Sequence, residues 1–178
     1  KYLKKINKKF IQIREPGGSK NAEKIRKLIL NNKSTFNRYT DLLLYLSARS
    51  ENIELIKKNA GKQIILIDRF SDSTIAYQHY GMGVNLKFIN NINDYLLKNI
   101  TVNFTFLNTV NQENMKKRLT LRKNLNRYDK FNNIFYDKVQ KGFIKIYKKN
   151  PSKYMKIDSN LDINYNEKII LNKINELI

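Results

Sequence analysis

The stretch of the chain with the clearest chemical potential is residues 68–83, DRFSDSTIAYQHYGMG, which follows the apolar run QIILI at residues 63–67. It places an acid, Asp68, beside an arginine, Arg69, and adds hydroxyl groups and tyrosines shortly afterwards. An apolar run rich in β-branched residues predicts a strand inside a parallel sheet. In open α/β sheets, ligands bind beyond the carboxyl ends of the strands, where loops carry the polar groups. We therefore predict a polar ligand site in this loop; the alternative is an ordinary strand-to-helix turn with a surface Asp–Arg ion pair.

A second polar cluster, REPGGS at residues 14–19, follows another apolar run. Pro16 fixes a turn, and Gly17 and Gly18 allow the backbone to approach a ligand closely. Pro-Gly-Gly is also common in loops without a ligand, so this cluster gains weight only together with the others.

A third cluster, YLSAR at residues 45–49, lies inside a helical pattern. Tyr45 and Arg49 are four positions apart and therefore share one helix face. An aromatic ring beside a planar cation suits a flat heterocycle with a carbonyl edge, since the ring stacks and the guanidinium donates hydrogen bonds. The alternative is a Tyr–Arg pair packed at the helix surface.

The elements that must position these clusters alternate along the chain. Alternating strands and helices with short connections predict an α/β fold, in which helices flank a parallel sheet, and no linker divides residues 1–178. The strands are predicted at residues 10–14, 63–67, 103–107 and 154–157, and the helices at residues 21–30, 41–58, 86–97, 112–121, 131–148 and 166–178.

The charge balance indicates an anionic partner. Lys and Arg number 35 against 15 acidic residues, a net charge of +20. The lysines are scattered and form no single stripe, which favours compositional drift from AT-rich coding, together with attraction to phosphorylated small molecules, over nucleic-acid binding. The chain has no cysteine, which excludes disulfides and thiolate metal sites and fits a cytoplasmic protein; no run is long enough to span a membrane. The only histidine, His79, excludes a His-rich metal site, and we expect it in a loop.

Taken together, the three clusters resemble the thymidylate kinase family. The family pattern is REPGG, then an aromatic residue with an arginine four positions later, then DRY-x-DSS-x-AYQ with a Gly-x-Gly tail. This chain has REPGG, YLSAR and DRFSDSTIAYQHYGMG in that order, and the similarity continues through FTFLN, MKKRL, RKNLNRYD and FYDKVQKGF. The resemblance implies a three-layer P-loop NTPase-type fold of the nucleoside monophosphate kinase kind. It also implies ATP-dependent phosphorylation of dTMP to dTDP, with Mg²⁺, on the route to dTTP.

The resemblance also implies a role for each matching residue. Tyr45, where the family usually has Phe, would stack on thymine, and Arg49 would bond the carbonyl edge of the base. Arg69 would hold the acceptor phosphate, which suits a reaction that depends on positioning and charge neutralisation. Asp68 would lie near the metal or its waters, and Tyr77 would crowd the 2′ position and favour deoxyribose. The remaining expected contacts are Arg14, Glu15 and Pro16 at the nucleotide pocket, Ser73, Thr74 and Gln78 at the base and sugar, and Arg122 and Arg127 in a lid segment, residues 122–130.

The chain departs from the family pattern at several points. The usual Gly-Arg-Gly is GMG here, Asn108 replaces an acid, and VN at residues 102–103 replaces Pro-Asp. Residues 1–178 contain no G-x-x-x-x-G-K-[ST] loop for ATP phosphates. The start, KYLKKINKKF, resembles the end of the helix that follows that loop, so we expect a strand and the loop in about 20 to 30 residues before Lys1.

Three other functions remain open from the sequence. The first is a nucleoside or deoxynucleoside monophosphate kinase with another base preference. The second is a basic nucleic-acid-binding protein on a kinase scaffold, and the third is an inactive paralogue. For the lid arginines, the alternative is a solvated basic loop. The resemblance further implies a homodimer that forms through helices on one side of the sheet.

Overall fold

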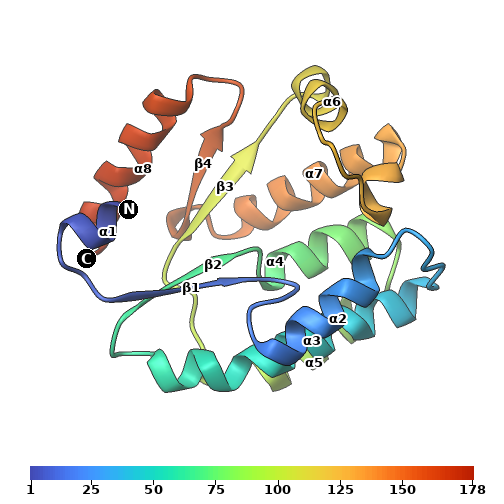
Figure 1. Cartoon of the computed structure of the whole chain (residues 1–178), viewed down its shortest axis with the longest axis horizontal. Coiled ribbons are helices and arrows are strands. Elements are labelled where there is room, and N and C mark those ends of the chain that lie inside the picture. Colours follow the sequence, from blue (N-terminus) through green and yellow to red (C-terminus); the bar gives the residue numbers. More distant parts are fainter.

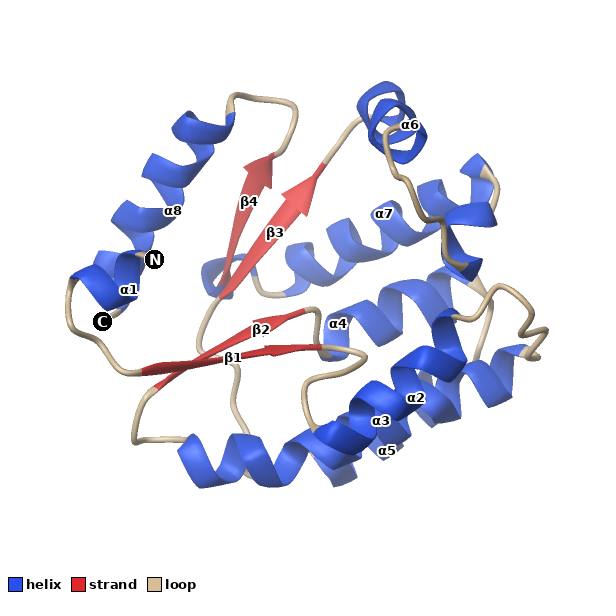
Figure 2. Ribbon diagram, in the orientation of Figure 1, coloured by secondary structure: helices blue, strands red, loops and turns tan.

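Strands and helices alternate in the computed structural model, which describes residues 1–178 (Figures 1 and 2). No helix is both long and apolar enough to cross a membrane. The elements are α1 (Tyr2–Lys5), β1 (Phe10–Arg14), α2 (Lys20–Leu30), α3 (Arg38–Asn59), β2 (Ile64–Asp68), α4 (Ser71–Thr74), a π-helix η1 (Ile75–Gly81), α5 (Leu86–Leu96), β3 (Thr105–Thr109), α6 (Gln112–Thr120), a 3₁₀ helix η2 (Arg127–Lys130), α7 (Asn133–Lys149), a 3₁₀ turn η3 (Pro151–Lys153), β4 (Tyr154–Asp158) and α8 (Ile163–Leu177).

The strands pair in parallel, which confirms the predicted α/β class. β1 pairs with β2, and β3 pairs with β4. Within residues 1–178, hydrogen bonds join the strands only within each pair, so the four strands form two separate two-stranded parallel sheets. Figure 2 shows the two pairs running in different directions. One consequence is that Leu66 of β2 is 38% exposed.

The pairing of β1 with β2 brings two of the three polar clusters together. Arg14 and Asp68 are register partners at the carboxyl ends of the two strands. One residue further on, the Glu15 backbone N–H donates to the Asp68 carbonyl at 2.9 Å. The REPGG loop and the DRF turn therefore start side by side, as expected at the carboxyl edge of a parallel sheet.

Helix α3 carries the third cluster and much of the core. The side chain of Asn37 caps its start by accepting from the backbone N–H groups of Tyr39 and Thr40, each at 3.0 Å. Its buried apolar residues recur at helical spacing, and Leu42 and Leu46 form a core cluster with Val84 and Ile89, on the side of α5 and η1. Three polar residues are buried on the same helix: Asp41, Arg49 and Asn52.

Residues 71–81 differ from the prediction, since they form α4 and η1 and not a loop. His79 is accordingly helical, and its Nδ1 lies 2.7 Å from the Val84 carbonyl oxygen. The helix packs closely on α7: a Cβ at Gly81 would lie 2.6 Å from Phe135, and one at Gly142 would lie 2.5 Å from Tyr80. π-Helical turns are rare and frequent at functional sites.

Candidate active site

The centre of the site is a buried ion pair between α3 and the REPGG loop. Arg49 is 1% exposed and Glu15 is 4% exposed. Nε and Nη2 of Arg49 donate to Oε2 of Glu15 at 2.9 and 2.7 Å. Nη2 also donates to Thr74 Oγ1 at 2.9 Å, and Nη1 donates to Asn93 Oδ1 at 2.7 Å. These bonds use four of the five guanidinium N–H groups and leave one on Nη1.

This burial sets the electrostatics of the pair. Burial raises the pKa of Glu15, and the charge and hydrogen bonds of Arg49 only partly oppose that shift. The second carboxylate oxygen of Glu15, Oε1, has no partner. Arg49 also lies 5.2 Å from the centre of the Phe70 ring. The alternative of a Tyr–Arg pair at the helix surface is wrong for Arg49.

At the end of β2, Asp68 and Arg69 are both exposed. Arg69 has φ +63°, a left-handed conformation that is strained for a residue with a side chain. Its guanidinium lies 5.3 Å from the centre of the Tyr77 ring. No ion pair joins Asp68 to Arg69, so the surface-pair alternative is not observed. Asp68 and Arg69 are therefore accessible residues at the carboxyl end of the strand.

An open pocket of about 440 Å³ lies beside Asp68; it is lined by Gln12, Ile13, Arg14, Gly18, Glu23 and Asp68. Gly18 has φ +107°, and a Cβ there would lie 2.8 Å from Ile13. Only glycine fits this close approach of the loop to β1. Arg14, with a side chain 53% exposed, lies 3.8 Å from Glu23. Pro16 is buried, and its carbonyl accepts from Arg26 at 2.7 Å.

Three tyrosines from three separate elements pack edge to face beside these residues. The ring of Tyr128 lies 5.9 Å from that of Tyr45 and 5.9 Å from that of Tyr77. Burial raises the pKa of Tyr45 to about 12, and it raises the pKa of Tyr128 as well. The phenols of Tyr45 and Tyr128 are therefore neutral at ordinary pH. Ser73 lies half-buried nearby in α4, and its backbone N–H donates to the Phe70 carbonyl at 2.9 Å.

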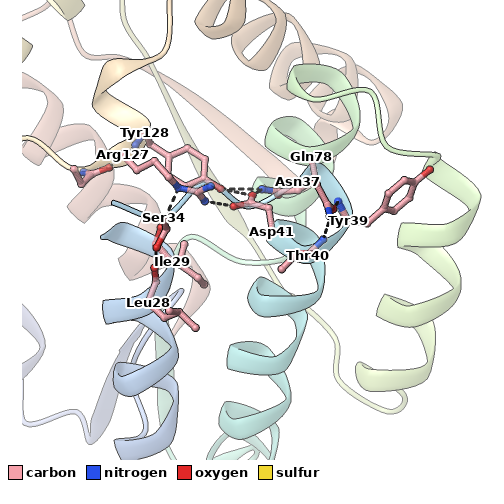
Figure 3. Close-up of polar contacts among 11 residues, drawn as sticks. Leu28, Ile29, Ser34, Asn37, Tyr39, Thr40, Asp41, Gln78, Arg127 and Tyr128 are labelled. Carbon is pink, nitrogen blue, oxygen red and sulfur yellow. Dashed lines mark hydrogen bonds and ion pairs between the residues drawn. The ribbon is translucent and has the colours of Figure 1, made fainter. Parts of the chain in front are cut away.

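Asp41 joins the predicted lid segment to the site (Figure 3). Its carboxylate is 1% exposed and accepts from Arg127 Nη2, from the Tyr128 hydroxyl and, at 3.0 Å, from Gln78 Nε2. Arg127 has a side chain only 12% exposed, so the solvated-loop alternative is wrong for it. Arg122 is 54% exposed and pairs with Asp129 at 2.7 Å.

The sequence-based prediction missed three residues of the site: Asp41, Asn93 and Tyr128. Asp41 precedes Tyr45 by four positions and Arg49 by eight, so helical spacing placed it on the same face. Tyr128 adjoins Arg127 in the RKNLNRYD segment, in which the family resemblance implied roles only for the arginines. Asn93 is 44 positions from its partner Arg49, and no sequence signal marks it.

No cluster of three or more His, Cys, Asp or Glu side chains is arranged to hold a metal ion. A magnesium ion that works on phosphates needs fewer protein ligands, because it keeps several waters and is held by one or two carboxylates together with phosphate oxygens. Asp68, exposed at the pocket, meets that requirement.

Comparison with known proteins shows one family. The family model described as thymidylate kinase matches residues 1–170. A thymidylate kinase from Mycoplasma capricolum is 37% identical, in an alignment covering 98% of this chain and 86% of that protein. One from Sulfurihydrogenibium is 36% identical with the same coverage. Among solved structures, the thymidylate kinase of Ehrlichia chaffeensis matches with a TM-score of 0.75 and 28% identity, covering 97% of this chain and 86% of that one.

Proposed function

The chain belongs to the thymidylate kinase family, and on that basis we propose that it transfers the γ-phosphoryl group of ATP to the phosphate of dTMP, giving dTDP and ADP. This reaction supplies the diphosphate needed for dTTP. Similarity over nearly the full chain to thymidylate kinases does not favour a nucleic-acid-binding role. The net charge of +20 then serves two highly charged nucleotide substrates.

The observation that carries the proposal is the convergence of a base-recognition pair and a free arginine on one edge of the fold. Arg49 keeps one Nη1 N–H for a carbonyl of the base, while its other four N–H groups donate to Glu15, Thr74 and Asn93. Tyr45 supplies a flat ring on the same helix face. A base lacking an acceptor at that position would leave a buried donor unpaired, which is a strong source of discrimination.

The acceptor phosphate is assigned to Arg69. Arg69 is an exposed residue whose guanidinium lies over the ring of Tyr77 and pairs with no carboxylate. A bidentate, charge-assisted Arg–phosphate pair both neutralises and orients the phosphate. Tyr77, directly beside it, is assigned to the sugar, where its ring would exclude a 2′-hydroxyl. Ser73 and Gln78 are assigned to the same side of the substrate.

On the ATP side, the residues of this chain that we assign are the lid arginines, Arg122 and Arg127, since residues 1–178 include no glycine-rich phosphate loop. Asp68 is the residue that would hold Mg²⁺, directly or through water. When bound, the ion neutralises charge on the phosphates as the γ-phosphoryl group moves.

We further propose a two-fold homodimer. Apolar exposure on neighbouring helices supports it, because Leu28 of α2 is 47% exposed and Leu43 of α3 is 48% exposed. Light scattering at micromolar concentration tests this; a monomer would contradict it.

The full-length protein tests the function. ADP release is measured with dTMP, dUMP, dCMP, dAMP and dGMP as acceptors, and dTMP should have the highest kcat/KM. A preference for another monophosphate would overturn the base assignment. The absence of turnover with all of them, together with steeply salt-dependent binding to DNA or RNA, would instead favour the nucleic-acid alternative.

A further inference from the structure

We propose that Asp41 is the positioning residue that docks the lid segment, residues 122–130, onto the nucleotide site. The docking itself is argued from the structure of this chain, and only its effect on turnover rests on the proposed function. Asp41 lies in the first turn of α3, far in sequence from the lid segment that it contacts. Figure 3 shows Arg127 and Tyr128 converging on it.

The Asp41 carboxylate is buried, and both of its oxygens accept hydrogen bonds. It is 1% exposed, and Oδ1 accepts from Arg127 while Oδ2 accepts from Tyr128 and from Gln78 at 3.0 Å. A buried charge without partners costs several kcal/mol, so these donors must stay in place for the carboxylate to remain buried. Two of the three donors belong to the lid segment.

The other polar contacts of the lid segment are weaker anchors. Arg122 and Asn126 pair with Asp129 inside the segment itself. The Leu125 carbonyl accepts from Asn32 at an exposed position. The Tyr128 carbonyl accepts from Tyr136 at 2.7 Å, and Arg127 Nε donates to the Ile29 carbonyl at 3.2 Å. Asp41 is therefore the one buried charged residue outside the lid segment that bonds to the segment.

This docking leaves Arg127 free to act on a phosphate. Its bonds to Asp41 and Ile29 use two of the five guanidinium N–H groups, so three remain. The side chain is still 12% exposed. Docking and phosphate binding can thus use different edges of the same guanidinium, and Asp41 fixes the orientation of the edge that stays free.

The same carboxylate orders the substrate side of the site. By holding the Tyr128 hydroxyl, Asp41 places that ring between Tyr45 and Tyr77, at 5.9 Å from each. By accepting from the Gln78 amide nitrogen, it leaves Gln78 Oε1 as a buried acceptor without a partner. Asp41 therefore ties the position of the lid to Gln78 directly and to Tyr45 and Tyr77 through the ring of Tyr128.

Hydrogen exchange of the full-length protein without substrate, followed by mass spectrometry, tests the docking directly. Asp41→Asn keeps the shape of the side chain and removes its charge. We expect amides of residues 122–130 to exchange at least about tenfold faster, while amides of β1 and β2 keep their wild-type rates. Asp94→Asn, at an exposed position of α5, is the matched control and should change neither.

Each outcome decides the proposal. Wild-type exchange of residues 122–130 in Asp41→Asn would overturn it, and so would faster exchange spread evenly over the whole chain, which indicates a general loss of stability. If Asp41→Asn does not fold, Tyr128→Phe, which removes only the hydroxyl, decides the matter on the same measurement. In turnover, Asp41→Asn should lower kcat/KM for dTMP by about 10- to 100-fold, and Tyr128→Phe should lower it by a smaller factor. If the wild type does not phosphorylate dTMP, the proposed function is wrong. The hydrogen-exchange rates of residues 122–130 still test whether Asp41 docks the lid segment.

Discussion

Arg49 donates two hydrogen bonds to a single oxygen of Glu15, at 2.9 and 2.7 Å, inside the protein. The pair joins the REPGG loop to α3, and Thr74 extends it to α4. Glu15 therefore acts through Arg49: it holds the guanidinium in one orientation and leaves a single Nη1 N–H for a substrate carbonyl. Rigid support of this kind is what a specific binding group needs.

Glu15→Gln should destabilise the protein strongly. It leaves the buried Arg49 charge without its counter-ion, a change that typically costs 3–5 kcal/mol, or about 6–20 °C in Tm for a domain of this size. Thermal unfolding measures the loss. The control is Glu113→Gln, which breaks an exposed pair with Lys117 at 2.8 Å and should change stability by less than about 1 kcal/mol. Equal Tm values for the two variants would show that the buried pair contributes nothing special.

Arg49→Lys tests base recognition. A lysine keeps the charge but cannot bond Glu15, Thr74 and Asn93 while also pointing a donor at the base. The KM for dTMP should rise by about tenfold or more, and the preference for dTMP over dCMP should fall. Tyr45→Phe, which keeps the stacking plane, should have a mild effect. Unchanged dTMP kinetics in Arg49→Lys would make the arginine purely structural.

The sequence predicted the strands well and the polar network poorly. The strand at residues 10–14 was confirmed with its bounds, and the other three lie within two residues of their predicted starts, because short apolar β-branched runs have few alternative structures. Residues 71–81 were expected to be a loop, because SDST has no apolar residue at helical spacing. They are helical in the structure because they pack on α7. The hydrogen-bond partners of Arg49 come from the REPGG loop, α4 and α5, three parts of the chain that only the fold brings together. Asp41 alone carried a usable signal, its helical spacing from Tyr45.

Alkaline pH should destabilise the protein through buried tyrosines. In the folded state burial raises the pKa of Tyr45 to about 12 from 10.0, so the folded chain holds a proton that the unfolded chain releases above pH 10. Stability is therefore fully present below pH 10 and falls as pH rises toward 12, by about 1 kcal/mol at pH 11 from this group alone. Urea unfolding at pH 9 and pH 11 should show that Tyr45→Phe loses less stability than the wild type over this interval. An identical loss in both proteins would assign the alkaline effect to other groups, among them Tyr136, whose pKa burial also raises to about 12.

Arg69→Lys separates transition-state stabilisation from folding. Arg69 is exposed and pairs with no carboxylate, so its replacement should shift Tm little. If it holds the acceptor phosphate through two parallel hydrogen bonds, lysine cannot reproduce them, and kcat/KM should fall by about 10² or more, on the order of 3 kcal/mol. Asp68→Asn should chiefly lower kcat and change the Mg²⁺ dependence, because it alters charge near the metal and not near the base. The matched control for Arg69→Lys is Arg38→Lys. Arg38 is also exposed, and its guanidinium lies 5.2 Å from the centre of the Tyr39 ring. Steady-state kinetics on the full-length variants should therefore show a large loss for Arg69→Lys and none for Arg38→Lys. Comparable activity in these two variants would remove Arg69 from the acceptor site and leave the phosphate to Arg14, the other exposed arginine at this edge.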